Sequence, residues 1–157
     1  MPPRTMVWRL LEASETLLKQ KPRSDAFRRR AVSTAYYAVF HALAETCANS
    51  LLPSTDHASD EYARVYRALD HGPLKAAFDK GPLKDRPNLR GIGALVVRLQ
   101  SERHRGDYLP PLGDVFHRSK AEDLVDQARR AVAKIESLDE GDRLTLATCL
   151  LFRSRQL

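Results

Sequence analysis

One segment constrains the fold more than any other, because it reads as a single long helix. Residues 25–51 run "DAFRRRAVSTAYYAVFHALAETCANSL", the longest and most regular pattern in the chain. Apolar side chains recur there at intervals of three and four residues, which aligns them along one side of a helix. They are Val32, Tyr36, Val39, Leu43 and Cys47. The segment predicts a core-facing helix over residues 25–51, with Ser24 as its N-cap.

Shorter helical patterns lie on either side of this segment. An apolar stripe predicts a helix over about residues 5–19, and a third helix is expected over about residues 59–70. Residues 73–81 are expected to form one or two turns. Asn88 is a plausible N-cap for a helix that ends near Gly106.

Two more helices are expected in the last third of the chain. Ser119 and Glu122 match the capping-box pattern ahead of a helix whose apolar face ends at Ile135. Asp139 can cap a final helix over about residues 140–153, which carries Leu144 on its apolar side.

No stretch alternates apolar and polar residues over a useful length, so no β-strand is expected. At 157 residues the chain suits one domain with one core. The sequence therefore predicts an all-α, up-and-down bundle of five to six helices, with residues 1–157 as a single domain.

Composition limits the classes of partner. Lys and Arg outnumber Asp and Glu by 26 to 20, a net charge of +6, which favours polyanionic partners such as RNA, DNA or an acidic protein. Cys47 and Cys149 have no metal-type spacing, so two free thiols and a reducing, cytoplasmic setting are expected. No cofactor or metal motif is present. The chain lacks an uncharged run long enough for a membrane span, and residues 1–20 lack the features of a secretory signal.

Charged and titratable residues gather in "RLQSERHRGDYLPPLGD", residues 98–114, between an apolar helical run and a double proline. The candidate catalytic residues in this stretch are Arg103, His104, Asp107 and Tyr108. The candidate phosphate-binding residues are Arg98 and Arg105 here and Arg30 and His41 on the long helix. Arginine pairs bidentately with phosphate, and histidine titrates near neutral pH, which suits both for work on a phosphodiester.

Two stretches carry a family resemblance. "RRAVSTAYYAVFHALAE", residues 29–45, leads from an arginine- and serine-bearing start into a Tyr-Tyr-Ala-x-Phe-His run. It resembles the second helix of bacterial and archaeal HEPN-domain proteins. "RHRGDY", residues 103–108, is similar to the Arg-x-x-Ala-Asp-Tyr signature of one branch of that family. Together the resemblance spans roughly residues 5–138.

The resemblance implies a small helical bundle that is usually a homodimer. In many relatives an Arg-x4-6-His motif from each protomer meets at the dimer cleft and cleaves RNA without a metal. The resemblance also implies a toxin–antitoxin or defence setting, with an antitoxin or nucleotidyltransferase as partner. Other family members act as binding modules without known activity. The expected dimer cleft lies near residues 98–108 and the long helix.

The chain departs from the catalytic motif of these relatives. Counting on from Arg103, the expected histidine position holds Tyr108, whereas Arg98 and His104 have five residues between them. In a straight helix Arg98 and His104 would point about 120° apart. Metal-free cleavage needs a base, an acid and a cation. We therefore expect Arg103 and Arg105 to hold the phosphate, His104 or His41 to exchange protons, and Tyr108 to orient or stack.

Simpler interpretations stay open. Arg103 with Asp107, and Arg98 with Glu102, are spaced as i, i+4 ion pairs of a helix surface. His41 can be a packed histidine. The run Arg28, Arg29 and Arg30 can be a solvated helix start or a patch that contacts a partner or nucleic acid. The alternative function is a non-catalytic helical module that binds a partner protein such as a nucleotidyltransferase, and a third is a structural dimer whose basic cluster is only surface charge.

Overall fold

A computed structural model describes residues 5–153, and every regular element in that range is a helix. Seven helices form there, and their residues fall into two compact units. The first unit holds residues 5–41 and 98–133 of the described range, and the second holds residues 42–97 and 134–153. The prediction of an all-α bundle is confirmed.

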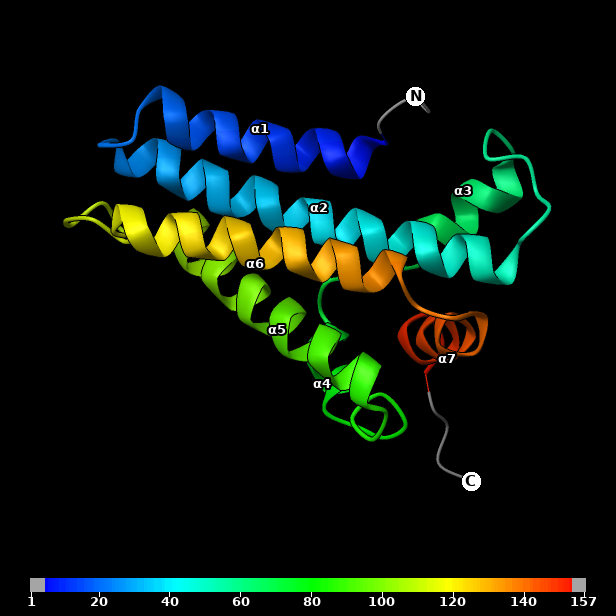
Figure 1. The fold of residues 1–157 in the computed structure, drawn as a ribbon. Coiled ribbons are helices and arrows are strands. Elements are labelled where there is room, and N and C mark those ends of the chain that lie inside the picture. Colours follow the sequence, from blue (N-terminus) through cyan, green and yellow to red (C-terminus); the bar gives the residue numbers. More distant parts are fainter. Residues whose placement is uncertain (1–4, 154–157) are drawn as a thin grey trace. The chain divides into compact units, whose positions relative to one another are not determined.

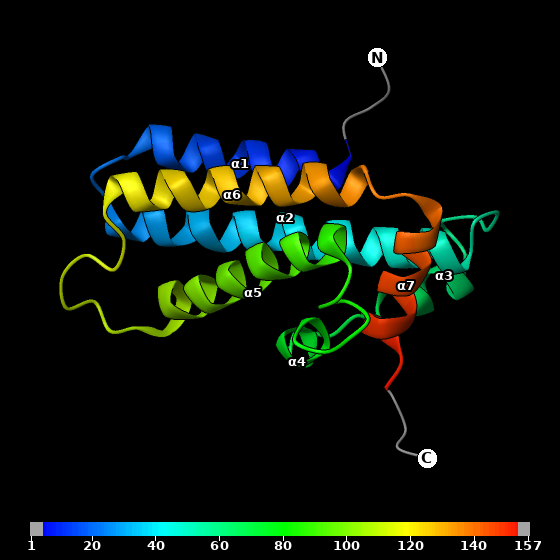
Figure 2. The same ribbon diagram turned by 60° about the horizontal axis from the view of Figure 1, so that its bottom comes forward.

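The first unit consists of four helical stretches that lie alongside one another (Figures 1 and 2). They are α1 (Met6–Gln20), the first part of α2 (Asp25–Leu51), the last part of α5 (Pro87–Tyr108) and most of α6 (Arg118–Glu136). An ion pair between Glu15 and Arg129 joins α1 to α6. The core includes Leu11, Val32, Tyr36, Leu99, Phe116 and Leu124, all fully buried.

The second unit adds the three short helices to the remaining parts of α2, α5 and α6. These helices are α3 (Asp60–Tyr66), α4 (Leu74–Phe78) and α7 (Glu140–Leu151), and α4 packs against α7. The Tyr62 hydroxyl donates to Asn49 Oδ1 at 2.8 Å, which joins α3 to α2. The buried side chains include Leu43, Cys47, Leu83, Ile92 and Leu146.

Several local predictions are confirmed. Helix α2 spans Asp25–Leu51 as expected, and all five residues of its predicted apolar stripe are fully buried. The Ser24 hydroxyl accepts from Phe27 N at 3.4 Å. Asp139 caps α7 by accepting from Asp142 N at 2.7 Å. Both cysteines are free thiols, and Cys47 is buried.

Two predicted helix starts are wrong. Helix α5 begins at Pro87, whose fixed φ suits a first turn, so Asn88 lies inside the helix and does not cap it. Helix α6 begins at Arg118, and its first bond runs from Ala121 N to His117 O at 3.0 Å. Ser119 is therefore helical and forms no capping box. The helix starts early because the chain just before it is held by α2: Val115 and Phe116 donate their backbone amides to Asp25.

The number of helices and one core residue also differ from expectation. Seven helices form in the described range, against five to six expected, because residues 74–78 complete a helix of their own. Helix α3 ends at Tyr66, earlier than the expected residue 70. Leu144, expected on the apolar face of the last helix, is half exposed, and Leu146 is buried instead. Among the described residues, no helix combines the length and the apolar character that a membrane span requires.

Candidate functional site

The predicted basic cluster lies in the first unit, where the last turns of α5 pack beside the first half of α2. Arg103 points toward α2, and only 13% of its side chain is exposed. Its guanidinium carbon lies 5.1 Å from the ring centre of Tyr36 and 5.9 Å from that of Tyr37, within range for cation–π attraction. Burial raises the pKa of Tyr36, against the nearby Arg103 charge, which lowers it. Arg103 thus lies beside the rings of two adjacent tyrosines.

Asp107 lies one helical turn beyond Arg103 and is surrounded by donors. Its Oδ2 atom is 3.5 Å from Arg103 Nη1 and 3.5 Å from Ser33 Oγ. Its Oδ1 atom is 4.0 Å from Nη1 of Arg30, whose side chain is 69% exposed. The interpretation of Arg103 and Asp107 as an i, i+4 ion pair is confirmed, and Arg30 joins the same carboxylate.

His104 and Tyr108 form a second pair on the same helix. Their ring centres are 4.7 Å apart with the planes tilted by 46°, and both side chains are exposed. Successive residues of a helix are turned by about 100°, so Asp107, His104, Tyr108 and Arg105 follow one another around the axis in that order. The two rings therefore separate the Asp107 and Arg30 side of α5 from its Arg105 side.

Arg98 and Arg105 are seven residues apart and share that other side of α5. Arg105 Nη1 is 2.9 Å from Glu102 Oε2, and Lys120 of α6 is 3.3 Å from the same carboxylate. Arg98 pairs with Asp123 of α6 at 3.9 Å, so the expected pair of Arg98 with Glu102 is wrong. Arg103 and Arg105 therefore belong to opposite sides of α5, and one chain does not bring them together on a single phosphate.

His41 lies eleven residues beyond Arg30 on α2, about 16 Å farther along the helix axis. It is half buried, its ring meets that of Phe40 at 6.2 Å edge to face, and burial lowers its pKa. This placement separates His41 from Arg30, and His104 is the histidine that lies within the cluster at the end of α5.

Sequence reasoning missed the role of the first turns of α2. Arg29 closes the end of α5: Nη1 donates to Leu109 O at 2.6 Å and to Gly106 O at 3.3 Å, and Nη2 donates to Pro110 O at 3.3 Å. Its Nε donates to Asp25 Oδ2 at 2.7 Å. The charge of Arg29 thus satisfies carbonyls at a helix C-terminus, where cations are favoured.

Arg28 holds the other end of the same loop. Its side chain is only 5% exposed, and it donates to Phe116 O and to Pro22 O, each at 2.8 Å, and pairs with Asp114 at 3.0 Å. Asp25 completes the arrangement by accepting from Val115 N at 3.1 Å. We call Asp25, Arg28 and Arg29 the loop clasp. Neither arginine of the clasp is a free phosphate-binding patch.

The pKa of Asp25 reflects this arrangement. Burial raises it, but the hydrogen bond from Arg29 and those from the amides of Phe116 and Val115 outweigh burial, and the pKa is lowered. One sequence signal points to the clasp: Arg28 lies four residues before Val32, on the stripe that faces the core.

The loop that the clasp holds presents apolar side chains to solvent. Figure 2 shows it as the long connection between α5 and α6. Tyr108 is 68% exposed, Leu109 is partly exposed, and Leu112 is 91% exposed. We call these three residues the apolar edge. Exposed apolar residues that gather beside cations are typical of surfaces that meet a partner.

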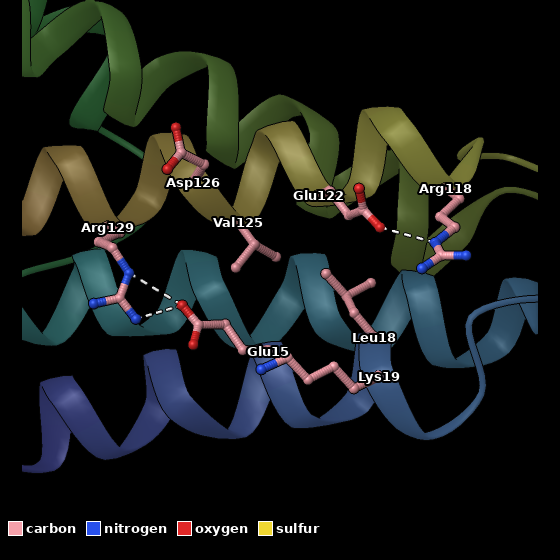
Figure 3. Close-up of a pocket in the computed structure, with 8 residues that line it drawn as sticks. All are labelled: Glu15, Leu18, Lys19, Arg118, Glu122, Val125, Asp126 and Arg129. Atoms are coloured by element: carbon pink, nitrogen blue, oxygen red, sulfur yellow. Dashed lines mark hydrogen bonds and ion pairs between the residues drawn. The ribbon is translucent and has the colours of Figure 1, made fainter.

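A groove of about 300 Å³ lies elsewhere in the first unit, between α1 and α6 (Figure 3). Leu18 and Val125 form its apolar part, and the ion pairs of Glu15 with Arg129 and of Arg118 with Glu122 lie along it. Three basic and three acidic side chains line the groove, so it does not concentrate one sign of charge as the end of α5 does.

Among the described residues, no group of three or more His, Cys, Asp or Glu side chains is arranged to hold a metal ion. Comparisons with protein-family models, with curated proteins and with solved structures each found no match.

Proposed function

We propose that this chain is an RNA-binding protein of HEPN type that acts in a toxin–antitoxin or defence setting. One observation carries the proposal: the exposed pair of His104 and Tyr108 lies between the Arg30 side and the Arg105 side of α5. An RNA strand offers phosphates to the cations and bases to the rings. The excess of basic over acidic residues in the chain is consistent with this partner.

The same residues define what cleavage would require. His104 can serve as base or acid near neutral pH, and arginine can stabilise the charge of the phosphorane. A second proton-transfer group is needed, because one imidazole cannot be both base and acid in the same step. In the homodimer that the resemblance implies, the His104 of a second copy supplies it. Metal-independent cleavage through the 2′-hydroxyl is therefore the reaction to test.

The binding test uses a fluorescent single-stranded RNA and measures anisotropy over a range of salt concentrations. Binding through phosphates weakens as salt increases. We expect Arg105→Ala and Tyr108→Leu each to weaken binding several-fold. Arg130→Ala is the matched control, since Arg130 is an exposed arginine of α6 in the same unit and pairs with Asp126. Equal effects of all three variants would refute the proposed site.

The cleavage test uses the same RNA in EDTA, with DNA of the same sequence as the control that lacks the 2′-hydroxyl. Cleavage predicts products with cyclic-phosphate ends from RNA alone and their loss in His104→Ala. Salt-sensitive binding without products would identify a binding protein and not an enzyme.

A specific observation favours a second candidate function, a non-catalytic module that binds a partner protein. The apolar edge, with Leu112 almost fully exposed, suits an apolar partner surface better than it suits a phosphate backbone. This candidate predicts a stoichiometric complex with the product of a neighbouring gene, such as a nucleotidyltransferase, that Leu112→Asp abolishes. It also predicts that RNA binding is absent.

A further inference from the structure

Three donors converge on the Asp107 carboxylate, and none of them reaches it closely. Arg103 Nη1 and Ser33 Oγ are each 3.5 Å from Oδ2, and Arg30 Nη1 is 4.0 Å from Oδ1. A charge-assisted hydrogen bond between a guanidinium and a carboxylate is usually about 2.7–2.9 Å long. The carboxylate is therefore attracted by its neighbours without being tightly bonded to any of them.

The charges around Asp107 do not cancel. Two guanidinium groups face one carboxylate, which leaves an excess of one positive charge at this point. The Nε atom of Arg103 is buried without a hydrogen-bond partner, so one of the two guanidinium groups is also incompletely satisfied. An arrangement of this kind can accept an anion with more charge and more acceptor atoms than a carboxylate has.

We propose that Arg30, Ser33 and Arg103 form a phosphate-binding site in which Asp107 is the internal competitor. The inference rests on the proposed function and deepens it, because it names the groups that receive a phosphate and the group that opposes its binding. A terminal phosphate brings three acceptor oxygens and close to two negative charges. It can therefore satisfy all three donors once the Asp107 side chain turns away.

Access to the site comes from the Arg30 side. The Arg30 side chain is 69% exposed, whereas those of Arg103 and Ser33 are largely buried. A phosphate first meets Arg30 and then replaces the Asp107 carboxylate beside Arg103. Asp107 thus lowers the affinity for phosphate, the opposite of what a catalytic or phosphate-binding role for this residue would predict.

The test removes the carboxylate while keeping the shape of the side chain. Isothermal titration calorimetry measures the binding of a 5′-mononucleotide and, in a second arm, of a single-stranded RNA without terminal phosphates. We expect Asp107→Asn to bind the mononucleotide at least about tenfold more tightly than the native chain, since the phosphate no longer has to displace a carboxylate of like charge. A comparable gain with RNA identifies backbone phosphodiesters as ligands, and a gain confined to the mononucleotide identifies a terminal phosphate.

Asp126→Asn is the matched control. It removes one negative charge from the same unit, at an exposed carboxylate that pairs with Arg130 one turn along α6. A general charge effect would strengthen binding equally in the two variants, and that result would overturn the inference. The double variant Arg30→Ala with Asp107→Asn is expected to lose the gain.

A variant that keeps Asp107 covers the case in which Asp107→Asn does not fold. Arg30→Ala should weaken mononucleotide binding, whereas Arg118→Ala should not, although the two arginines are equally exposed. Equal binding by both variants would overturn the inference. RNA binding by the native chain without any gain in Asp107→Asn would remove this inference and leave the proposed function. Tighter mononucleotide binding by Asp107→Asn, with no RNA binding by the native chain, would support this inference and refute the proposed function.

Discussion

The guanidinium of Arg29 donates to the carbonyl oxygen of Leu109 at 2.6 Å, across 80 residues of sequence. This bond joins the second turn of α2 to the residue that follows α5. Together with Arg28 and Asp25, it determines where α5 ends and how the loop toward α6 leaves it. The clasp thus holds the backbone of Gly106, Leu109 and Pro110, at the end of α5 where Tyr108 and the apolar edge lie.

Arg29→Ala should destabilise the protein by about 2 kcal/mol, because it removes hydrogen bonds from a charged donor to carbonyls that then lack a partner. Urea unfolding measures this loss, and amide hydrogen exchange should become faster at residues 106–112. Arg30→Ala is the control, since the exposed neighbour should change stability by under about 0.5 kcal/mol. Equal stability of the two variants would contradict the clasp.

Gly106→Ala should also destabilise, by about 1–2 kcal/mol, although alanine is the better helix former. A Cβ atom at Gly106 would lie 2.9 Å from the ring of Phe116, which is fully buried and whose backbone Arg28 and Asp25 hold in place. Gly91→Ala, on the same helix with nothing within 4 Å of its Cβ position, should instead stabilise by up to about 1 kcal/mol. Thermal unfolding of both variants measures the two effects. Midpoint temperatures that shift in the same direction would be inconsistent with a tight contact at Gly106.

Asp25→Asn should lower the free energy of unfolding by about 2 kcal/mol at pH 7. The pKa of Asp25 is lowered from its ordinary value of 3.8, so the folded state favours the carboxylate and gains stability above that value. This gain is lost as pH falls through the lowered pKa. The free energies of unfolding of the native chain and the variant should then become equal. Urea titrations from pH 7 to pH 2 follow the difference. Asp126→Asn, at an exposed carboxylate, should change stability by under about 0.5 kcal/mol.

Glu45→Gln should change the free energy of unfolding at pH 7 in the opposite direction, by raising it. Burial raises the pKa of Glu45, the Glu136 charge raises it further, and His57 opposes both. The folded state therefore holds the Glu45 proton more tightly than the unfolded chain does, and stability falls as pH rises from 4.5 through the raised pKa. Glu45→Gln removes this dependence and should be more stable than the native chain at pH 7. A less stable variant at pH 7, with an unchanged pH slope, would be the contrary result.

The sequence predicted the helices well where local pattern decides the structure. Helix α2 has a regular apolar stripe, and both its bounds and its buried side follow from that stripe. The start of α6 could not be found in the same way. Val115 and Phe116, which lie 90 and 91 residues beyond Asp25, donate their backbone amides to the Asp25 carboxylate. These distant hydrogen bonds fix the chain ahead of α6, and the local Ser119 capping pattern does not reveal them.

The three consecutive arginines show a similar limit at the candidate site. Arg28, Arg29 and Arg30 are alike in sequence, yet 5%, 14% and 69% of their side chains are exposed. Successive positions on a helix turn by about 100°, so the phase of the apolar stripe separates Arg28 from Arg30. The sequence identified the cluster at residues 98–108, and helical rotation alone places Arg103 and Arg105 on opposite sides of a helix. The partners of each arginine required the positions of α2 and α6.

The clasp anchors residues 106–110 on one side of the loop and residues 114–116 on the other, and leaves the tip between them free of its bonds. Gly113 there has a φ of +91° and no atom within 4 Å of its Cβ position. A short tag or a cysteine-linked dye placed between Leu112 and Gly113 should therefore leave both anchors in place. Such a label would lie a few residues from Tyr108 and would report ligand binding directly by its fluorescence.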